Sequence, residues 1–445
     1  MSDEKSNKLN RRQFMGGMMA AGAAYTIVPR YVLGDTGHTP PSEKLNIAAI
    51  GAGGMGATNI EAVSSENIVA LCDVDEERAA QTFNKYPQAR KYKDFRKMLE
   101  KEKNIDAVIV ATPDHTHAAA TMMAIKLGKH VYCQKPLTHT VYEARRVTEA
   151  ARDAKVATQM GNQGHSSEGV RLICEWIRDG AIGPVREVHC WTDRPLGYWP
   201  VGIDRPKDTP AVPATLDWDL WVGPALKRAY HPAYAPFKWR GWWDFGCGAL
   251  GDMGCHVMDG AFSALKLNYP VSIEASSTPV NSDSEPVAAI VHYQFPQRAD
   301  MPAVKLHWYN GGLMPARPEE LEPGRKLPES GSIFVGDKGK IMCGCYSDSP
   351  RIIPEEKMKA YPQPAKTIPR IAGTHEQNWI DACKGGEPAC SNFDYAGLLT
   401  EVVLLGNIAI RTGEKLNWDG PGMKCTNVPK ANEYVHAQYR DGWTL

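Results

Sequence analysis

A glycine-rich turn near the start of the chain constrains its fold more than any other feature. The segment "KLNIAAIGAGGMGATNIEAV", residues 44–63, runs from an apolar strand pattern through a turn into the start of a helix. Gly51, Gly53 and Gly56 match G-x-G-x-x-G, where the glycines permit a tight turn, close approach of a pyrophosphate, and close packing of helix on strand. This predicts a dinucleotide site facing a helix N-terminus, with Gly54 and Met55 in the same turn.

An acidic residue ends the next predicted strand. "NIVALCDVD" places Asp73 22 residues after Gly51, where its carboxylate can accept hydrogen bonds from both ribose hydroxyls of a dinucleotide. The same charge would repel a 2′-phosphate, so NAD is favoured over NADP as the cofactor. The alternative role for Asp73 is a helix N-cap, and Asp75 lies further past the strand end.

Strand and helix patterns alternate through residues 105–163. Buried strand patterns at 105–113, 129–136 and 155–163 are separated by helical patterns at 114–128, capped by Asp114, and at 138–154. This alternation predicts an α/β fold with a Rossmann-type, doubly wound parallel sheet over residues 44–164. Ligands of such sheets bind at the carboxyl ends of the strands, so the predicted cofactor site also takes in Thr112, Pro113, His117, Gln134, Lys135 and Asn162.

A second small-residue segment, "ALGDMGCHVMDGAF", carries Asp252 and His256 four positions apart. If this segment is helical, the two side chains point to the same side of the helix. A carboxylate and an imidazole on one face indicate proton-transfer chemistry, a metal site or an ordinary surface pair.

The chain contains five segments in this order: the glycine turn, "CDVD", "ATPDHTH", "GKHVYCQKPLTHT" and "GDMGCHVMD". On these segments the chain resembles the Gfo/Idh/MocA oxidoreductases, a family named for glucose–fructose oxidoreductase and inositol dehydrogenase. The resemblance runs from about Lys44 to the C-terminus. It implies that Lys135 is aimed at the nicotinamide, often beside a cis Lys135–Pro136 peptide. It also implies that Asp252 and His256 lie on a helix that enters the active site. The family usually has glutamate where this chain has Gln134.

Oxidation of a secondary alcohol removes a hydride from carbon and a proton from oxygen, and that proton needs a base within hydrogen-bond reach. By the resemblance, Lys135 and His256 serve the alcohol oxygen, and Asp252 orients His256 or binds a neighbouring hydroxyl. No metal is expected, because the histidines near the strand ends match no compact ligand motif.

Residues 165–445 are expected to form a substrate-binding α+β domain with an open, mainly antiparallel sheet. Strand patterns occur at "REVHCWTDRP", "VSIEAS", "VAAIVHYQF", "AVKLHWYN" and "SIFVGDKGKIMCG". Seven of the twelve tryptophans lie between Trp191 and Trp243, in loops rich in Pro, Gly, Arg and Asp. Such loops suit a carbohydrate or polyol, although the tryptophans could equally pack the loops against the sheet. The substrate contacts predicted are His165, Arg194, Tyr198, Trp199, Arg240 and Trp243.

The chain opens with a leader in which Arg11 and Arg12 precede a short Gly/Ala/Met run, as in a twin-arginine export signal. Residues 1–40 are therefore assigned to a signal and linker, and the mature protein to the periplasm, delivered by the twin-arginine export machinery. Lys plus Arg equals Asp plus Glu, which gives no electrostatic reason to expect nucleic acid as a partner. No permanent membrane span is expected, and the family's open sheet face implies a homo-oligomer.

These observations predict an NAD-dependent oxidoreductase that acts on a secondary hydroxyl of a sugar, glycoside or polyol. The cofactor is NAD, which either exchanges freely or stays tightly bound to the protein. The alternative is a redox-neutral glycoside hydrolase of the same fold, which oxidises, eliminates, hydrates and then reduces its substrate. That cycle would suit the periplasm, which lacks a ready pool of free NAD.

Overall fold

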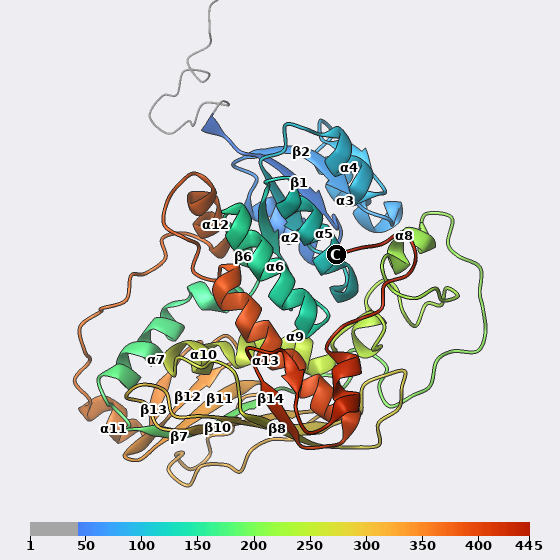
Figure 1. The fold of residues 1–445 in the computed structure, drawn as a ribbon. Helices are drawn as coiled ribbons and strands as arrows, with labels where there is room; N and C mark the ends of the chain where they lie inside the picture. Colours follow the sequence, from blue (N-terminus) through green and yellow to red (C-terminus); the bar gives the residue numbers. More distant parts are fainter. Residues whose placement is uncertain (1–42) are drawn as a thin grey trace, which may run out of the picture. The chain divides into compact units, whose positions relative to one another are not determined.

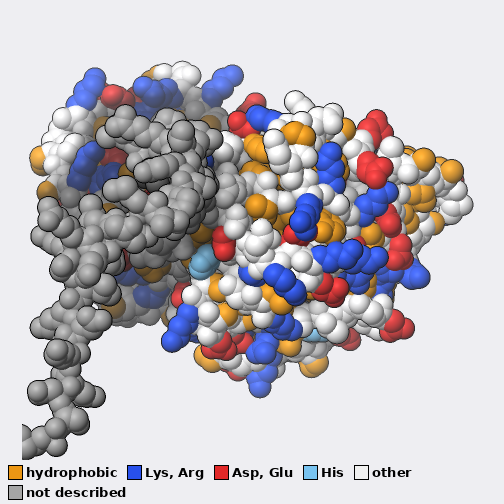
Figure 2. All heavy atoms as spheres, turned by 90° about the horizontal axis from the view of Figure 1, so that it is seen from above, with side chains coloured by type: hydrophobic (Ala, Val, Ile, Leu, Met, Phe, Trp, Pro, Cys, Tyr) orange, Lys and Arg blue, Asp and Glu red, His pale blue; other side chains and the backbone are white. Residues whose placement is uncertain are grey.

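The computed structural model describes residues 43–445, and Leu45–Leu445 form one compact unit that contains two large β-sheets (Figure 1). The predicted leader with Arg11 and Arg12 lies outside the described residues. On the described part of the face in Figure 2, Lys and Arg side chains lie among Asp and Glu side chains, in keeping with the zero formal net charge of the sequence.

The first sheet is parallel throughout and has the strand order β3-β2-β1-β4-β5-β6, as the alternating sequence pattern predicts. The strand order reverses between β1 and β4, which is where sheets of this type bind ligands. Its elements are β1 (Asn46–Ile50), α2 (Met55–Ala62), β2 (Asn67–Cys72), α3 (Glu76–Lys85), β3 (Arg90–Tyr92), α4 (Phe95–Lys101), β4 (Ala107–Val110), α5 (Asp114–Lys126), β5 (His130–Cys133), α6 (Val141–Ala154) and β6 (Thr158–Met160).

Local sequence explains most of these elements. All four residues of β4 are buried and apolar, as is typical of a parallel strand covered on both faces. Helix α6 begins with a capping box, in which the Thr140 hydroxyl accepts from the N–H of Glu143 and the Glu143 carboxylate accepts from the N–H of Thr140.

The predicted cap of α5 is wrong. Pro113 occupies the N-cap position of α5 and Asp114 is the first helical residue. The Asp114 carboxylate instead accepts a hydrogen bond of 3.1 Å from the N–H of Cys247, far along the chain. A tertiary contact has therefore replaced the local one that the sequence suggested.

The second sheet has nine strands in the order β13-β12-β11-β7-β10-β9-β8-β14-β15. Every pair is antiparallel except β7 with β10, so the prediction of a mainly antiparallel sheet is confirmed. Its strands are β7 (Val185–Trp191), β8 (Ser272–Ser277), β9 (Ala289–Phe295), β10 (Val304–Asn310), β11 (Gly331–Gly336), β12 (Gly339–Gly344), β13 (Arg351–Ile353), β14 (Leu416–Asp419) and β15 (Lys424–Cys425).

Helices connect and cover these strands. They are η3 (Gln163–Ser166), α7 (Glu168–Arg178), α8 (Trp218–Val222), η4 (Lys238–Gly241), α9 (Gly248–Val257), α10 (Asp259–Ala264), α11 (Glu355–Ala360), α12 (His375–Cys383), α13 (Phe393–Thr412) and η5 (Pro429–Tyr434).

Helix α13 joins the two halves of the unit, because it packs on α6 and β6 of the first half and on α9, β8 and β9 of the second (Figure 1). It is the one described helix long and apolar enough to cross a membrane, but most of it is buried inside the fold. Such burial is typical of a core helix. Its packing brings α9, which carries Asp252, up to the strand ends of the first sheet.

Candidate active site

A cavity of about 320 Å³ lies at the carboxyl ends of the first sheet, and we refer to it as the strand-end cavity. The glycine turn, the ends of β2, β4 and β5, the segment around η4, and α9 all contribute to its walls. Ten of the residues predicted to bind a cofactor line it: Gly51, Gly53, Gly54, Met55, Asp73, Thr112, Pro113, His117, Gln134 and Lys135. Asp252 and Arg240 also line it, so cofactor and substrate predictions meet in one cavity.

The glycine turn has no space for side chains. Gly51 has a φ of +88°, and a Cβ atom there would lie 2.4 Å from the carbonyl oxygen of Ala111. A Cβ atom on Gly56 would lie 2.0 Å from the carbonyl oxygen of Gly51, so α2 packs against the turn as closely as the motif predicts. The bare backbone that results can approach a pyrophosphate at the start of α2, so these residues fit a dinucleotide.

Asp73 lies beside this turn and holds it in shape. Its Oδ2 accepts hydrogen bonds from the N–H groups of Ala52 (2.8 Å) and Gly53 (3.2 Å), and its Oδ1 accepts from Asp75 (3.0 Å). Burial raises the pKa of Asp73, although these bonds oppose the shift. Asp75, not Asp73, is the N-cap of α3. Asp73 therefore keeps a place on the cavity wall, where it can meet a ribose.

Lys135 and Asp252 form an ion pair where the cavity meets α9. The Lys135 Nζ donates to Asp252 Oδ1 (2.9 Å) and to the Asp252 carbonyl oxygen (2.7 Å). The two side chains are only 14% and 7% exposed, so the pair is shielded from water. The Lys135–Pro136 peptide is cis, as the resemblance implied. An ammonium has three protons, so one remains for a bound molecule.

Two arginines complete the surroundings of Asp252. Arg194 Nη1 donates to Asp252 Oδ2 and Arg240 Nε donates to Oδ1, each over 3.2 Å. Burial alone would raise the pKa of Asp252, but Lys135 and Arg240, with Arg194, outweigh it and hold that pKa well below its usual range. Asp252 is therefore a carboxylate at any pH near neutral, and three cations share it.

Aromatic rings hold these arginines in place. The Arg194 guanidinium lies 3.5 Å from the centroid of the Tyr198 ring, and that of Arg240 lies 4.2 Å from Trp239 and 4.4 Å from Phe237. Stacking fixes the plane of each guanidinium and leaves its edges free to donate. Three of the predicted substrate residues, Arg194, Tyr198 and Arg240, thus meet around Asp252.

Two further buried acids lie close to this cluster. Burial raises the pKa of Asp114 to about 7, against the opposing charges of Arg240 and Lys135. Burial also raises the pKa of Glu285 to about 8, and its carboxyl oxygens accept from the Trp199 indole and from the N–H of Ala249 at the start of α9. Glu285 is therefore largely protonated near neutral pH and does not offset the cations.

His256 lies one helical turn beyond Asp252 and is 4% exposed. Burial, followed by the charge of Lys135, lowers its pKa well below the ordinary value, so the ring is neutral. Its Nδ1 is buried and has no hydrogen-bond partner among residues 43–445, and its ring meets Tyr346 edge-on, with 4.8 Å between the centroids. It does not line the strand-end cavity.

Other predicted site residues have structural partners. Asn162 is fully buried, donates to Asp259 (3.3 Å) and accepts from Ser391 (2.6 Å). His165 pairs through Nδ1 with the same Asp259 carboxylate, at 2.9 Å. His117 lines the cavity with each ring nitrogen 2.8 Å from a backbone carbonyl, Nδ1 from Pro136 and Nε2 from Thr112. The neutral ring has one N–H and donates it to one of these carbonyls.

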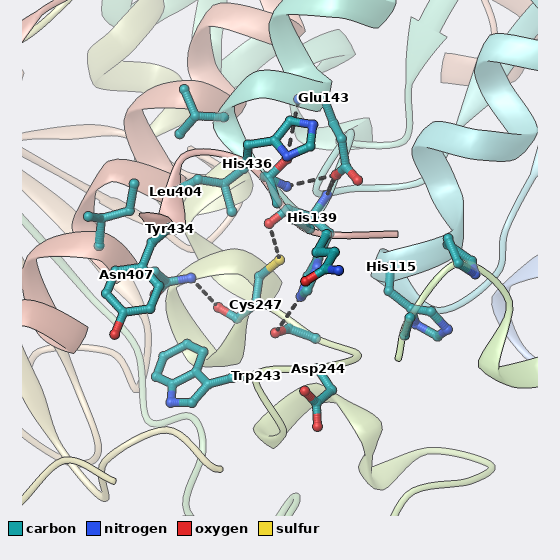
Figure 3. Close-up of a pocket in the computed structure, with 18 of the residues that line it drawn as sticks. His115, His139, Glu143, Trp243, Asp244, Cys247, Leu404, Asn407, Tyr434 and His436 are labelled. Atoms are coloured by element: carbon teal, nitrogen blue, oxygen red, sulfur yellow. Dashed lines mark hydrogen bonds between the residues drawn. The ribbon is translucent and has the colours of Figure 1, made fainter. Parts of the chain in front are cut away.

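Trp243 lies away from Asp252, in a second cavity of about 330 Å³ (Figure 3). That second cavity is bounded by the loop before α6, the segment leading into α9, the last turns of α13 and the C-terminal residues 433–439. The sequence placed Trp243 with the other loop aromatics because nothing in a Trp-rich loop says which way each ring turns.

Sequence reasoning also missed Arg78 and the aromatic wall at Phe237 and Trp239. The Arg78 side chain lies against the glycine turn, since a Cβ atom on Gly54 would come within 2.7 Å of its Nη2. An arginine five residues beyond the acid that ends β2 was a readable signal, because such a residue can meet a ribose phosphate. The aromatic wall had no such signal.

Comparison with known proteins decides the family. Residues 45–162 match the Gfo/Idh/MocA oxidoreductase family over its NAD-binding Rossmann fold, and residues 196–301 match the C-terminal alpha/beta domain of the same family. The chain belongs to the Gfo/Idh/MocA family. Its first domain is accordingly an NAD-binding Rossmann domain, and the glycine turn and Asp73 lie in the part that matches.

Curated relatives resemble parts of the chain. Levoglucosan dehydrogenase of Pseudarthrobacter phenanthrenivorans is 25% identical over 240 residues, 50% of this chain and 53% of that protein. Inositol 2-dehydrogenase of Salmonella typhimurium is 29% identical over 151 residues, 33% of this chain and 45% of that protein. The chain thus spans about half the length of the curated relatives it matches.

Solved structures share the fold over more of the chain. The WlbA dehydrogenase from Bordetella pertussis, solved with NADH and UDP-GlcNAcA, has a TM-score of 0.61 at 17% identity and covers 84% of this chain and 99% of its own. Levoglucosan dehydrogenase with NADH and L-sorbose has a TM-score of 0.57 at 17% identity, over 84% of this chain and 98% of its own. At these identities the likeness shows the fold.

Proposed function

We propose that this chain is an NAD-dependent dehydrogenase that acts on a secondary hydroxyl of a sugar, glycoside or polyol. The observation that carries the proposal is the buried Lys135–Asp252 pair, 2.9 Å apart, at the wall of a cavity that also holds the glycine turn. The names of the relatives, inositol and levoglucosan dehydrogenases, support this substrate class.

NAD, when bound, supplies the acceptor for the hydride that the alcohol carbon loses. Lys135 would hold the alcohol oxygen with the one N–H that Asp252 does not use, and so favour the loss of its proton. Asp114 lines the strand-end cavity and has a pKa of about 7, so its ionised form can take a proton there. His256 is neutral and has a ring nitrogen without a partner among residues 43–445, but it lies outside the cavity lining. Asp252 holds Lys135 in position through their ion pair of 2.9 Å.

The charges around Asp252 indicate which sugars suit the site. Lys135, Arg194 and Arg240 bring three cations to one ionised carboxylate, and the neighbouring Glu285 is protonated. Only Asp114, with its pKa of about 7, supplies part of a second negative charge. A buried excess of positive charge is costly unless a ligand offsets it. We therefore propose that the substrate carries a carboxylate, as in a uronate or an aldonate, and that Arg194 and Arg240 bind it.

The first experiment is to purify the protein without added nucleotide, denature it and count the NAD released per chain by mass spectrometry. The protein is then assayed with NAD and a panel of free sugars, sugar acids and aryl glycosides. Net NADH from a free sugar or sugar acid supports the dehydrogenase. Release of an aglycone without net NADH, with about one NAD retained per chain, supports the redox-neutral glycoside hydrolase instead.

Lys135→Met separates catalysis from cofactor binding. We expect turnover to fall by at least about a thousandfold, because the alcohol oxygen loses its charged donor, while NAD is still bound. If turnover survives within about tenfold, equal to about 1.4 kcal/mol of barrier, Lys135 does not contact the reacting oxygen.

We also propose that residues 1–40 are a twin-arginine signal and linker, that residues 44–164 and 165–445 are separate domains, and that the protein works in the periplasm as a homo-oligomer. The adjacent Arg11 and Arg12 support the signal. Replacing both with lysine should keep a reporter fused after residue 40 in the cytoplasm. Export of that variant at the original rate would refute the proposal, and light scattering of the mature chain gives the oligomeric state.

A further inference from the structure

The second cavity contains a cation, Arg411, that has no ion-pair partner among the described residues 43–445. Arg411 is in the last turn of α13 and lines this cavity with its guanidinium 4.0 Å from the centroid of the Tyr434 ring and 5.3 Å from that of Trp243. Within residues 43–445, no carboxylate lies within 4.0 Å of it and none of its N–H groups finds an acceptor. Burial lowers its pKa, and the charge of Asp244 only partly opposes that shift.

Two of the acids that line the second cavity, Asp244 and Glu143, are already engaged. The Asp244 carboxylate pairs with Arg228 and Arg205, and the buried Glu143 carboxylate accepts from the Tyr439 hydroxyl and from backbone N–H groups at the start of α6. The bonds of Glu143 stabilise the start of α6, because Glu143 completes the capping box of that helix. Neither acid can turn to Arg411 without leaving its present partners.

Glu433 is the third acid of the lining and is exposed, whereas the buried histidines of the second cavity are uncharged. Burial lowers the pKa of both His115 and His139 to about 4, so both rings are neutral near pH 7. His139, Asn407 and Cys247 lie around the cavity in Figure 3, where Asn407 donates to the Cys247 carbonyl over 2.8 Å. An anion that entered would meet the Arg411 cation and neutral donors, because Asp244 is neutralised by two arginines, Glu143 is satisfied by its hydrogen bonds, and Glu433 is exposed to water.

We propose that the second cavity is a binding site for a small organic carboxylate, separate from the strand-end cavity. The carboxylate would pair with the edge of the Arg411 guanidinium, where two parallel N–H groups match its two oxygens. The carbon body would lie along the Trp243 and Tyr434 rings, which suit the C–H faces of a sugar acid. A volume of about 330 Å³ is at the small end for ligand sites, which favours a ligand the size of a single sugar acid.

This second site would adjoin the active site through Cys247. The Cys247 N–H donates to Asp114, which lines the strand-end cavity, and its carbonyl accepts from Asn407, which lines the second cavity. The two cavities are thus on opposite sides of the segment that leads into α9. The proposal concerns binding alone and stands whether or not the proposed dehydrogenase activity is found.

Calorimetry on the full chain, saturated with NAD, tests the proposal with D-glucuronate and D-gluconate as probes and with D-glucose and inorganic phosphate as comparisons. We expect a carboxylate to bind at a site that remains in Arg194→Gln and that is weakened at least about tenfold in Arg411→Gln. D-glucose should not compete. Absence of carboxylate binding up to about 10 mM, or loss of binding in Arg194→Gln but not in Arg411→Gln, would overturn the proposal.

A measurement on the unmodified protein avoids the risk that a variant fails to fold. Phenylglyoxal reacts with accessible guanidinium groups, and peptide mass spectrometry reports the reaction at each arginine. We expect D-glucuronate to protect Arg411 in protein whose strand-end cavity is saturated with NAD. The exposed Arg186, paired with Asp337 at the surface, serves as the unprotected control. Equal protection of both arginines, or none at Arg411, would show that the second cavity does not bind the carboxylate.

Discussion

The strand-end cavity and the second cavity both hold guanidinium groups against aromatic rings, but they differ in what balances the charge. Lys135, Arg240 and Asp252 line the strand-end cavity, and Arg194, which pairs with Asp252 beside that cavity, shares the carboxylate with both. In the second cavity, Arg411 has aromatic neighbours and no carboxylate within 4.0 Å among the described residues. The first cavity thus contains its own counter-charge, whereas the second depends on a ligand or on water.

This difference separates the two uses of a buried cation. A carboxylate that binds three cations fixes their positions before any ligand arrives, which is what a reaction at a defined atom requires. A single arginine held only by stacking is free to accept whichever anion fits. The strand-end cavity, with Asp252, therefore suits catalysis, and the second cavity, with Arg411, suits ligand binding without a reaction.

The largest expected effect comes from removing the counter-charge. Asp252→Asn leaves Lys135, Arg194 and Arg240 without a buried carboxylate, and we expect it to lower the free energy of unfolding by about 3 kcal/mol. Arg411→Gln removes a cation without an ionic partner among residues 43–445, so the free energy of unfolding should change by no more than about 1 kcal/mol, the worth of its stacking. Urea denaturation of the two variants measures both. Equal losses would mean that Arg411 has a partner within the fold, and the contrast between the cavities would fail.

Each cavity also has a buried histidine that should make the fold sensitive to acid. Burial lowers the pKa of His115, on the second cavity, and of His117, on the strand-end cavity, to about 4. The unfolded chain, with a histidine pKa of about 6.5, binds more protons in between, so stability present above about pH 6.5 is lost as the pH falls towards 4.

For each ring this loss should reach about 2 kcal/mol between about pH 7.5 and pH 5. We expect His115→Gln and His117→Gln to flatten the pH dependence of the unfolding free energy by similar amounts, measured by urea denaturation. His436→Gln, at an exposed ring, is the matched control. An unchanged pH profile in either variant would mean that the pKa of its ring in the folded state is close to the unfolded value of about 6.5.

Much of the strand-end cavity could be predicted from the sequence, because its residues follow local rules. The glycine turn and the strand ends of a parallel sheet must gather at one edge, so Gly51, Asp73, Thr112 and Lys135 come together without any tertiary information. The spacing of Asp252 and His256 could likewise be read from the helical period, although only Asp252 lines the cavity.

The rest depended on contacts that no local pattern encodes. Arg194 and Arg240 reach Asp252 across 58 and 12 residues, from loops without periodicity. Trp243 faces the second cavity although it lies only three residues beyond Arg240, because the chain turns within η4 and the residues after it. Asp114 left its expected capping role for a bond to Cys247. Such residues are placed by packing of distant segments, and composition alone could not assign them to one cavity or the other.

Arg194→Gln tests whether the site prefers acidic sugars, because glutamine keeps a polar side chain there and removes the positive charge of the arginine. We expect kcat/KM for a uronate or aldonate substrate to fall about twentyfold, and that for the matching neutral sugar to change by less than about threefold. Steady-state assays of NADH formation give the ratio. Arg411→Gln is the control, since that arginine lies in the second cavity and should leave the ratio as it is. A uniform fall for acid and neutral sugars would assign Arg194 to positioning Asp252.

Arg78 is another arginine without a nearby carboxylate to balance it among residues 43–445, and it lies at the cofactor end of the strand-end cavity. Its side chain lies against the glycine turn beside Asp73, and it has no carboxylate within 4.0 Å among residues 43–445. Asp73→Ala should weaken NAD binding and shift the NAD-to-NADP preference by about tenfold towards NADP. The shift follows because a 2′-phosphate would lose its repulsion and could pair with Arg78.

The double variant Asp73→Ala with Arg78→Gln gives the decisive control, since it removes the cation that would receive the phosphate. Fluorescence titration with NADH and NADPH should then show a loss of affinity for both and a preference within about threefold of the unmodified protein. If the single variant already leaves the preference unchanged, Asp73 acts only on the turn through Ala52 and Gly53 and does not meet the ribose. In that outcome Arg78, which has no carboxylate within 4.0 Å among residues 43–445, would be an ordinary surface arginine. A missing counter-charge would then indicate a ligand only where the cation is at least half-buried, as Arg411 is.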